Sequence, residues 1–505
     1  MRSSTDGPAL APPLDRHVSS RALKAMGLTA LMLVVVFMQI PSLFSLDPSS
    51  PFRSAEVPNS DKFEHMFATK TKYWDQRNVE AINSVAILTR AMLPLRALKI
   101  SADQTPLRED LKLIQTQIVA RHGVRYPTGG NINEINALLD KLKPFEGLLP
   151  TWMRNYSLPY NLSVQGQLAE TGKLELRKLG VRSLARSGYD EGAVYSKEKY
   201  RVTHTQVART RDSAIAFAKA FFGNAEDVEF IERPKNKDIL LRFFDVCPRY
   251  QREVKKNQTA QEQVHEFQRS STVARTAQWL TQSLGLKEEN ITFSAKNLMA
   301  VQSACAFDIA IYHHKHHWCS LMSMTFIHAL DYLDDLEQFY WTGAGYQINY
   351  EMAAVLLREV FATMTARATG DSTLLGSFFF AHAETTIPLM TLMGYGDRTP
   401  LLANATEDGI ASRGFRSSTL SPFAANIEFR LFKRKSSDEE FYVQILVNEK
   451  EAAIPGCGRV YCKLSELEQQ WLYYLKVYDF YKDCIDGIQR RLFERRGNVL
   501  AGRNS

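Results

Sequence analysis

Residues 111–128 read LKLIQTQIVARHGVRYPT, and this stretch decides the fold that we expect. Its first part, Leu111 to Val119, is typical of a buried strand because apolar and β-branched residues dominate it. An abrupt Arg-His-Gly turn follows the strand. Apolar side chains then recur at the spacing of an amphipathic helix, at Ile132, Ile135, Leu138, Leu139 and Leu142.

The order of the remaining elements favours an α/β fold. A second helix is predicted from Thr171 to about Ser187, and a strand at Tyr200 to Thr205. A further helix shows its apolar face at Ala214, Phe217 and Phe221, and later strands are predicted at Leu374–Ala381, Ile427–Phe432 and Phe441–Val447. From this order we expect a three-layer α/β domain, with helices on both faces of its sheet.

Composition divides the chain further. Between residues 224 and 345, charged and Gln-rich helical patterns replace the strands, so this range is predicted to be an inserted, mainly helical domain. The α/β domain then consists of residues 47–223 and 346–490, followed by a tail at 491–505. Its first ten residues are rich in Ser and Pro, which is typical of a linker.

The N-terminal region predicts entry into the secretory pathway. Residues 25–46 contain an apolar run after a basic tail at 1–24, which is either a cytosolic tail or the n-region of a signal. The long basic lead-in favours a membrane anchor, whereas Gln39 and Pro41 shorten the run and favour a cleaved signal peptide. Both alternatives place the rest of the chain in the endoplasmic reticulum lumen or outside the cell. Five N-glycosylation sequons agree with this location, at Asn155, Asn161, Asn257, Asn290 and Asn404.

The chain has six cysteines, an even number that allows all of them to pair in disulfides. Sequence alone permits fifteen pairings. Cys457 and Cys462 flank a short turn-like segment and are expected to pair; Cys305 with Cys319 is the second choice, which leaves Cys247 with Cys484. The alternative is six buried thiols in a cytosolic enzyme, and the N-terminal region argues against it.

The first candidate site lies in the turn after the opening strand, at Arg121, His122, Gly123 and Arg125. Ligands of open α/β sheets bind at the carboxyl ends of the strands. Arginine forks match phosphate oxygens, glycine allows close approach of the backbone, and a neutral histidine is a competent nucleophile. A buried structural histidine between two surface arginines is the alternative. The packing of all four residues at a strand end favours the site.

A second candidate pair, His382 and Glu384, follows the strand predicted at Leu374–Ala381. Positions two apart in an extended chain point the same way, so both side chains are expected to face one cavity. Histidine can bind a phosphate oxygen, and a protonated glutamate can donate to a leaving alkoxide. The alternative is a glutamate at a helix start, where the macrodipole favours it, beside a structural histidine.

Arg209 is a third candidate, again located between a predicted strand and a predicted helix. A single arginine in such a place is usually a solvated surface residue. Its interest comes from the two other candidate segments, because all three follow strands of one sheet.

The three segments together resemble the histidine phosphatase superfamily, in its acid phosphatase and phytase branch, and are most similar to the multiple inositol polyphosphate phosphatases. Residues 121–127 match the signature Arg-His-Gly-x-Arg-x-Pro, and residues 382–384 match His-Ala-Glu, where most of the branch carries His-Asp. The resemblance runs from roughly residue 60 to 490. Further matching segments lie at 241–247, 334–336, 343–346, 421–426, 448–449 and 454–457.

The resemblance implies that His122 becomes transiently phosphorylated and that Glu384 protonates the leaving inositol hydroxyl. The implied ligands of the phosphate oxygens are Arg121, Arg125, Arg209 and His382. The expected substrates are inositol hexakisphosphate and lower inositol polyphosphates, and the family also suggests 2,3-bisphosphoglycerate. Because the acid must keep its proton while His122 stays neutral, activity is expected in a mildly acidic window. The alternatives are a general acid phosphatase and a membrane-anchored protein that binds inositol polyphosphates without turnover.

No cofactor or metal is expected for this chemistry. His313, His316 and His317 could share a helical face, but clustered imidazoles alone do not make a four-coordinate zinc site, and a polar helix end is favoured. The net charge of +7 is a mild excess for 505 residues, without a long basic block. The expected partner is therefore a small polyanionic substrate and no nucleic acid, together with a membrane if the N-terminal segment is uncleaved. The oligomeric state stays open.

Overall fold

The computed structural model describes residues 63–73, 105–188 and 193–485. The predicted N-terminal tail and apolar segment at 1–46, the linker after them and the tail at 491–505 lie outside these residues. Within the described ranges, none of the helices combines the length and the apolar character that crossing a bilayer demands.

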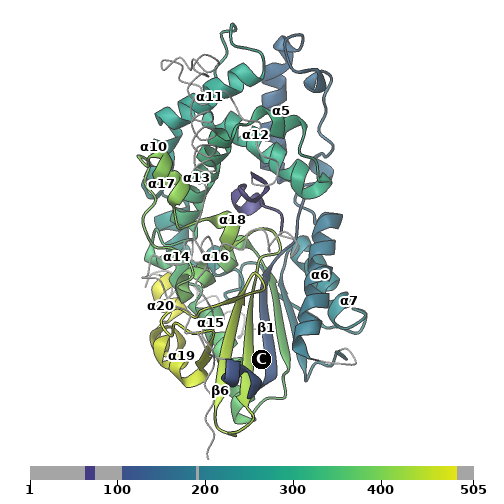
Figure 1. The fold of residues 1–505 in the computed structure, drawn as a ribbon, viewed down its shortest axis with the longest axis vertical. Helices are drawn as coiled ribbons and strands as arrows, with labels where there is room; N and C mark the ends of the chain where they lie inside the picture. Colours follow the sequence, from purple (N-terminus) through teal and green to yellow (C-terminus); the bar gives the residue numbers. More distant parts are fainter. Residues whose placement is uncertain (1–62, 74–104, 189–192, 486–505) are drawn as a thin grey trace, which may run out of the picture. The chain divides into compact units, whose positions relative to one another are not determined.

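The fold is built on one mixed sheet of eight strands (Figure 1). The strand order is β3-β2-β4-β1-β5-β6-β7, and β8 also pairs with β6. Strands β1 to β4 run parallel to one another, and the later strands are antiparallel. The strand bounds are Leu111–Arg121, Tyr200–Thr205, Phe230–Arg233, Gly376–Ala381, Asn426–Arg434, Phe441–Val447, Lys450–Ala452 and Tyr461–Lys463, for β1 to β8. The carboxyl ends of the parallel strands meet at one edge, so the segments after β1, β2 and β4 come together there.

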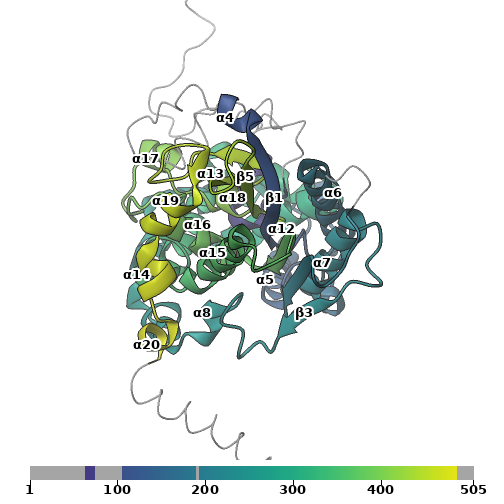
Figure 2. The same cartoon turned by 90° about the horizontal axis from the view of Figure 1, so that it is seen from below.

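Helices cover both faces of this sheet, which confirms the three-layer arrangement (Figure 2). In β4, Phe378 and Phe380 face α6 (Glu170–Ser187) and α7 (Ala208–Phe221), where they pack on Phe217. Phe379, which lies between them, belongs to the hydrophobic core on the opposite face, with α15 (Ala354–Thr369) and α16 (Ala383–Met393). Successive side chains of this buried strand therefore pack into two different hydrophobic cores, one on each face of the sheet.

A mainly helical part lies beyond the carboxyl edge of the sheet (Figure 1). Its longer helices in the range 224–345 are α10 (Glu262–Gln268), α11 (Ser271–Ser283), α12 (Ala295–Phe307) and α13 (Met324–Trp341). The shorter α-helices of the described residues are α4 (Thr105–Glu109), α8 (Phe243–Val246), α9 (Pro248–Tyr250), α14 (Gln347–Glu351), α17 (Glu407–Ser412), α18 (Ser417–Leu420), α19 (Leu464–Gln470) and α20 (Phe480–Cys484).

Two elements differ from the expected division into domains. Strand β3 lies inside the range predicted to be helical, and α5 (Gly129–Leu142), from the predicted sheet domain, packs against α12. Half-exposed and exposed side chains give β3 no apolar pattern, and helical spacing does not tell which surface a helix covers. The division at residues 224 and 345 stays a prediction.

Three disulfides cross-link the described part of the chain, and they pair as expected. They are Cys247–Cys484, Cys305–Cys319 and Cys457–Cys462. The first joins the start of α9 to the end of α20, across a sequence separation of 237 residues. The five sequon asparagines are all exposed, and glycosylation at them stays a prediction.

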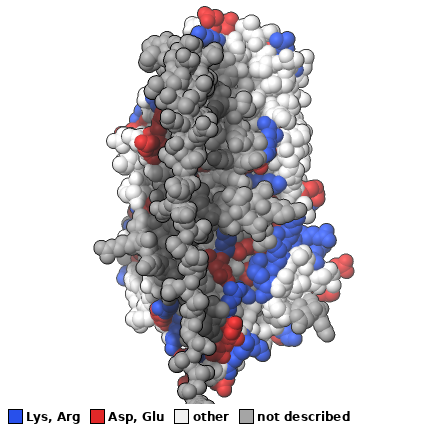
Figure 3. All heavy atoms as spheres, in the orientation of Figure 1, with Lys and Arg blue, Asp and Glu red and all other residues white. Residues whose placement is uncertain are grey.

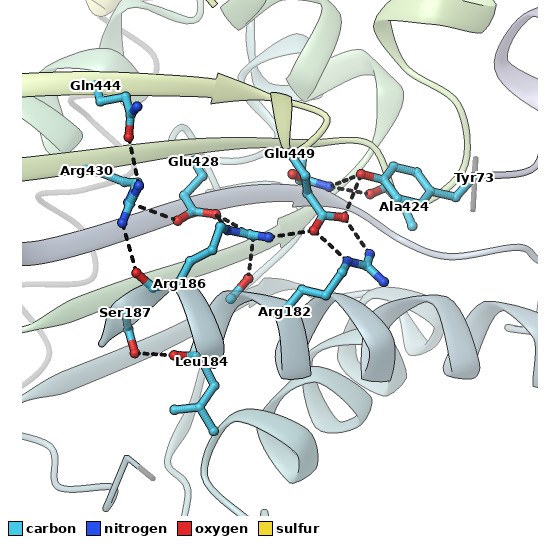
Figure 4. A network of polar contacts seen from close by, with 12 residues as sticks. Tyr73, Arg182, Leu184, Arg186, Ser187, Ala424, Glu428, Arg430, Gln444 and Glu449 are labelled. Atoms are coloured by element: carbon cyan, nitrogen blue, oxygen red, sulfur yellow. Dashed lines mark hydrogen bonds and ion pairs between the residues drawn. The ribbon is translucent and has the colours of Figure 1, made fainter. Parts of the chain in front are cut away.

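Buried ion pairs fasten α6 to the sheet (Figure 4). The Glu449 carboxylate, 3% exposed, accepts hydrogen bonds from Arg182 Nε at 2.7 Å and from Arg186 NH1 at 2.8 Å. Tyr73 donates its hydroxyl to the same carboxylate at 2.9 Å. Arg186 also binds Glu428 of β5, whose side chain is 1% exposed. The network therefore connects α6, β5, the turn after β6 and the segment around Tyr73.

Candidate active site

The loop after β1 carries three of the candidate residues, and its backbone is held from several sides. The His122 amide donates to Ala381 O at 3.1 Å, and its carbonyl accepts from the Ala424 amide at 3.0 Å. The Val124 amide donates to Glu175 Oε2 of α6 at 2.8 Å. Neighbouring strands and α6 thus fix the position of His122.

Two glycines allow α6 to approach this loop closely. A Cβ atom added to Gly123 would lie 2.3 Å from the carbonyl oxygen of Gly172 in the first turn of α6. A Cβ atom added to Gly172 would lie 2.1 Å from the carbonyl oxygen of Val124. Since backbone atoms cannot yield as flexible side chains do, each position requires glycine for this contact.

The His122 ring is held as one neutral tautomer. Its Nδ1 lies 2.9 Å from Gly123 O, and a carbonyl only accepts hydrogen bonds, so the proton is on Nδ1. The lone pair of Nε2 is therefore available for attack. Burial lowers the pKa of His122 well below its ordinary value, and the charges of Arg209 and Arg121 lower it further. The ring thus stays neutral at mildly acidic pH.

Three arginines lie close enough to this ring for their charges to lower its pKa. Arg121 donates from NH1 to backbone carbonyls at 2.6 and 2.7 Å, and its guanidinium lies 4.5 Å from the centroid of the Phe423 ring. Arg125 continues the loop, and Arg209 comes from the first turn of α7. Burial and the charge of Arg125 lower the pKa of Arg121 to about 9; burial and the charge of Arg209 lower that of Arg125 to about 10. Both remain cationic near neutrality.

Two buried donors of these arginines are unsatisfied within the described part of the chain. The buried Nε atoms of Arg121 and Arg209 make no hydrogen bond among the residues that the structure describes. Buried donors are normally paired, and the oxygens of an anion can satisfy such groups. The arrangement is that of a site for a phosphate or a similar anion.

The structure brings His382 to this site and corrects the expected geometry of Glu384. Strand β4 ends at Ala381, His382 is the N-cap of α16, and Glu384 lies in the first helical turn. The two side chains are therefore related by a helix start and not by strand alternation, because the helix begins one residue after His382. The His382 ring lies 5.7 Å from the His122 ring, centroid to centroid.

Glu384 lies close enough to the arginines to act on their ionisation. Burial lowers the pKa of Arg209, and the Glu384 carboxylate is the next largest influence and raises it. The same carboxylate also opposes the lowering at Arg121 and Arg125. The six predicted site residues therefore gather around the carboxyl ends of β1, β2 and β4.

Sequence reasoning missed three residues that touch this site. Thr205 and Arg242 contact Nε2 of His382 at 2.9 and 2.7 Å, and Glu175 holds the loop. Arg242 lies in the matching segment 241–247, which was the one signal that could have identified it. Thr205 and Glu175 carry no local signal, because each is an ordinary position near the end of a strand or within a helix.

The histidine cluster at 313–317 does not form a metal site with the residues that the structure describes. Among residues 63–73, 105–188 and 193–485, no three His, Cys, Asp or Glu side chains are placed to hold a metal ion. His317 stacks on Trp152, and His313 Nδ1 lies 2.9 Å from Lys72 Nζ.

Figure 3 shows Lys and Arg gathered beside α6 and α7. A groove of about 720 Å³ lies there, and its lining mixes Lys173, Arg177 and Lys219 with Glu170, Asp212 and Glu226.

The fold and the phosphate-type site define the class of protein. The pattern of the histidine phosphatase superfamily (branch 2) matches residues 112–448, and the chain belongs to this family. The chain is also similar to individual members of this family. The chain is 29% identical over 476 residues to human "Multiple inositol polyphosphate phosphatase 1", covering 88% of this chain and 90% of the human protein. The chicken protein of the same name is 29% identical over 391 residues, covering 74% and 84%.

Solved structures agree with the fold. A multiple inositol polyphosphate phosphatase from Bifidobacterium longum, in complex with inositol hexasulfate, matches with a TM-score of 0.61 and 17% identity, over 83% of this chain and 99% of that protein. The phytase of D. castellii matches with a TM-score of 0.62 and 17% identity, over 82% and 92%.

Proposed function

We propose that this protein hydrolyses inositol polyphosphates, inositol hexakisphosphate included, through a phosphohistidine formed on His122. The observation that carries the proposal is the His122 ring, neutral, with its proton on Nδ1 and Nε2 free among three arginines. A phosphomonoester carries about −1.5 to −2 charges near neutral pH, so it needs this cationic surrounding. The similarity to multiple inositol polyphosphate phosphatases supports the substrate class, and 2,3-bisphosphoglycerate is a second substrate in the same proposal.

The reaction has two steps in this proposal. Nε2 of His122 attacks the phosphorus, the ester bond breaks, and Glu384 donates its proton to the leaving inositol oxygen. Water then attacks the phosphohistidine, Glu384 takes one proton from it, and inorganic phosphate leaves with the histidine restored. Arg121, Arg125 and Arg209 stabilise the charge that develops on the phosphate oxygens in both steps. His382 donates to one of the same oxygens.

The proposed location is the secretory pathway. Three disulfides, which persist in oxidising compartments, support it, and so do the exposed asparagines of the five sequons. The apolar segment within residues 25–46 acts in this proposal as a signal that is cleaved or kept as an anchor. Determination of the N-terminal residue of the mature protein distinguishes the two.

The decisive experiment measures phosphate release from inositol hexakisphosphate, with His122→Ala as the control. We expect release by the wild type, a 32P-labelled histidine after acid-free quenching, and neither in the variant. Release that survives His122→Ala would refute the phosphohistidine route. Tight substrate binding without release by the wild type would favour the binding protein, and equal rates on p-nitrophenyl phosphate would favour a general acid phosphatase.

A further inference from the structure

Arg242 lies in the turn before α8 and contacts the His382 ring directly. Its NH1 is 2.7 Å from His382 Nε2, and only 7% of the residue is exposed. We infer that Arg242 is a positioning residue that keeps the proton of His382 on Nδ1, the nitrogen beside Arg209. This inference rests on the proposed function, in which His382 donates a hydrogen bond to a phosphate oxygen.

The chemistry of the guanidinium group dictates the tautomer. Arginine only donates hydrogen bonds, so Nε2 of His382 must offer its lone pair to Arg242. A neutral imidazole carries one proton, which therefore resides on Nδ1. Burial lowers the pKa of His382 well below its ordinary value, and Arg209, Arg242, Arg121 and Arg125 lower it further, so the neutral form prevails.

This tautomer explains the position of Arg209. Its NH2 lies 3.4 Å from Nδ1 of His382, and both atoms are donors in this tautomer. Two such donors do not bond to each other, but one phosphate oxygen can accept from both. Arg242 thus acts on the phosphate through His382, by turning its donor towards the site.

The turn that carries Arg242 is held in place by three contacts. Arg242 NH2 forms an ion pair with Asp245, and its amide donates to Asp238 O at 3.0 Å. Thr385 Oγ1, in the first turn of α16, donates to Leu241 O at 2.8 Å. The turn that carries Arg242 is therefore tied to the helix that begins just after His382, so the two side chains keep their relative position.

Thr205 is the other neighbour of Nε2, at 2.9 Å, but it does not select a tautomer. A hydroxyl can donate or accept, and Thr205 has Thr210 Oγ1 as a further partner at 2.9 Å. It can therefore serve either protonation pattern, whereas Arg242 can serve only one.

The test compares Arg242→Met with Arg242→Lys, since lysine keeps a donor-only cation and methionine has similar length without donors. Histidine-selective ring 15N labelling reports the tautomer of His382, and its signal is assigned by its loss in His382→Ala. We expect the proton on Nδ1 in the wild type and in Arg242→Lys. In Arg242→Met we expect it on Nε2, donated to Thr205.

Kinetics complete the test. Arg242→Met is expected to weaken competitive inhibition by inorganic phosphate about 10- to 100-fold, while Arg242→Lys recovers most of the affinity. Arg275→Met, which removes an exposed arginine of α11, is the matched control and should change neither readout. A wild-type His382 protonated on Nε2, or an unchanged tautomer in Arg242→Met, would overturn the inference. These spectra need no turnover, so they stand apart from a failure of the proposed function, which would appear as no phosphate release by the wild type.

Discussion

Replacing Glu449 by glutamine is expected to destabilise the protein, because the change leaves two arginines of α6 short of a charged partner. The carboxylate accepts four hydrogen bonds, two from Arg182 and one each from Arg186 and Tyr73 (Figure 4). A glutamine amide keeps one acceptor oxygen and turns an NH2 group towards donors. The remaining contacts are therefore fewer, and their acceptor no longer carries a negative charge.

The magnitude follows from the burial of the partners. Breaking a fully buried ion pair costs about 3–5 kcal/mol. Here the side chains of Arg182 and Arg186 are 25% and 20% exposed, so water partly solvates them. Arg186 also keeps its ion pair with Glu428 at 2.7 Å. We therefore expect a loss of about 2–3 kcal/mol in the free energy of unfolding.

Urea unfolding at several pH values measures this loss. Burial alone would raise the pKa of Glu449, but the hydrogen bonds and charges of Arg182 and Arg186 outweigh it and hold the pKa below its ordinary value. A lowered folded-state pKa gives stability that is complete above the unfolded pKa, roughly 4.3, and is lost as pH falls through the folded value. The difference between wild type and Glu449→Gln should be full above about pH 5 and shrink below pH 4.

Glu407→Gln is the matched control, because Glu407 forms an exposed ion pair with Arg275 and its side chain is 71% exposed. It should change the free energy of unfolding by less than about 1 kcal/mol. If Glu449→Gln proved as mild as this control, or kept its full effect at pH 3, the charge network would not fasten α6 as described.

Three further outcomes are expected. Gly172→Ala should lower phosphatase activity about 100-fold, since its Cβ meets Val124 O at 2.1 Å and displaces the catalytic loop; initial rates with inositol hexakisphosphate measure this. Cys247→Ser/Cys484→Ser should lose about 5 kcal/mol of stability in the chain-entropy estimate, seen as an earlier urea midpoint. Burial raises the pKa of Glu175 to about 7, so the folded state holds an extra proton and the wild type loses stability as pH rises from about 4.5 to 7. Glu175→Gln lacks this titration. Between pH 5 and pH 8 the wild type should therefore lose about 3 kcal/mol more of its free energy of unfolding than the variant, which unfolding measured at both pH values tests.

Local sequence patterns were sufficient to predict the elements that are buried and regular. Strands Tyr200–Thr205 and Phe441–Val447 have the predicted bounds, because aromatic and β-branched residues dominate both segments. Strand β3 was missed, since four half-exposed or exposed residues at an edge show no period. The helix start after His382 was also missed, because an extended chain and a cap look alike in sequence.

Part of the candidate site could likewise be predicted from local sequence, and part of it could not. Arg121, His122 and Arg125 stand in one continuous motif, so their proximity follows from the chain itself. The contact between Arg242 and His382 spans 140 positions of sequence, and no local pattern encodes it. Which donor meets which ring nitrogen depends on the packing of two loops, and only the assembled fold determines that.

The Cys247–Cys484 bond has a consequence for proteolysis. It makes residues 247–484 a covalent ring that contains His382 and Glu384, while His122 lies outside the ring. A protease that nicks the exposed stretch 406–409 would open the ring without releasing a fragment. The nicked protein should migrate as one band in a denaturing gel until a reductant is added and should then separate into two pieces. The C-terminal piece, which carries β5 and β6 of the sheet, thus stays covalently attached to the part that holds His122 and Glu384.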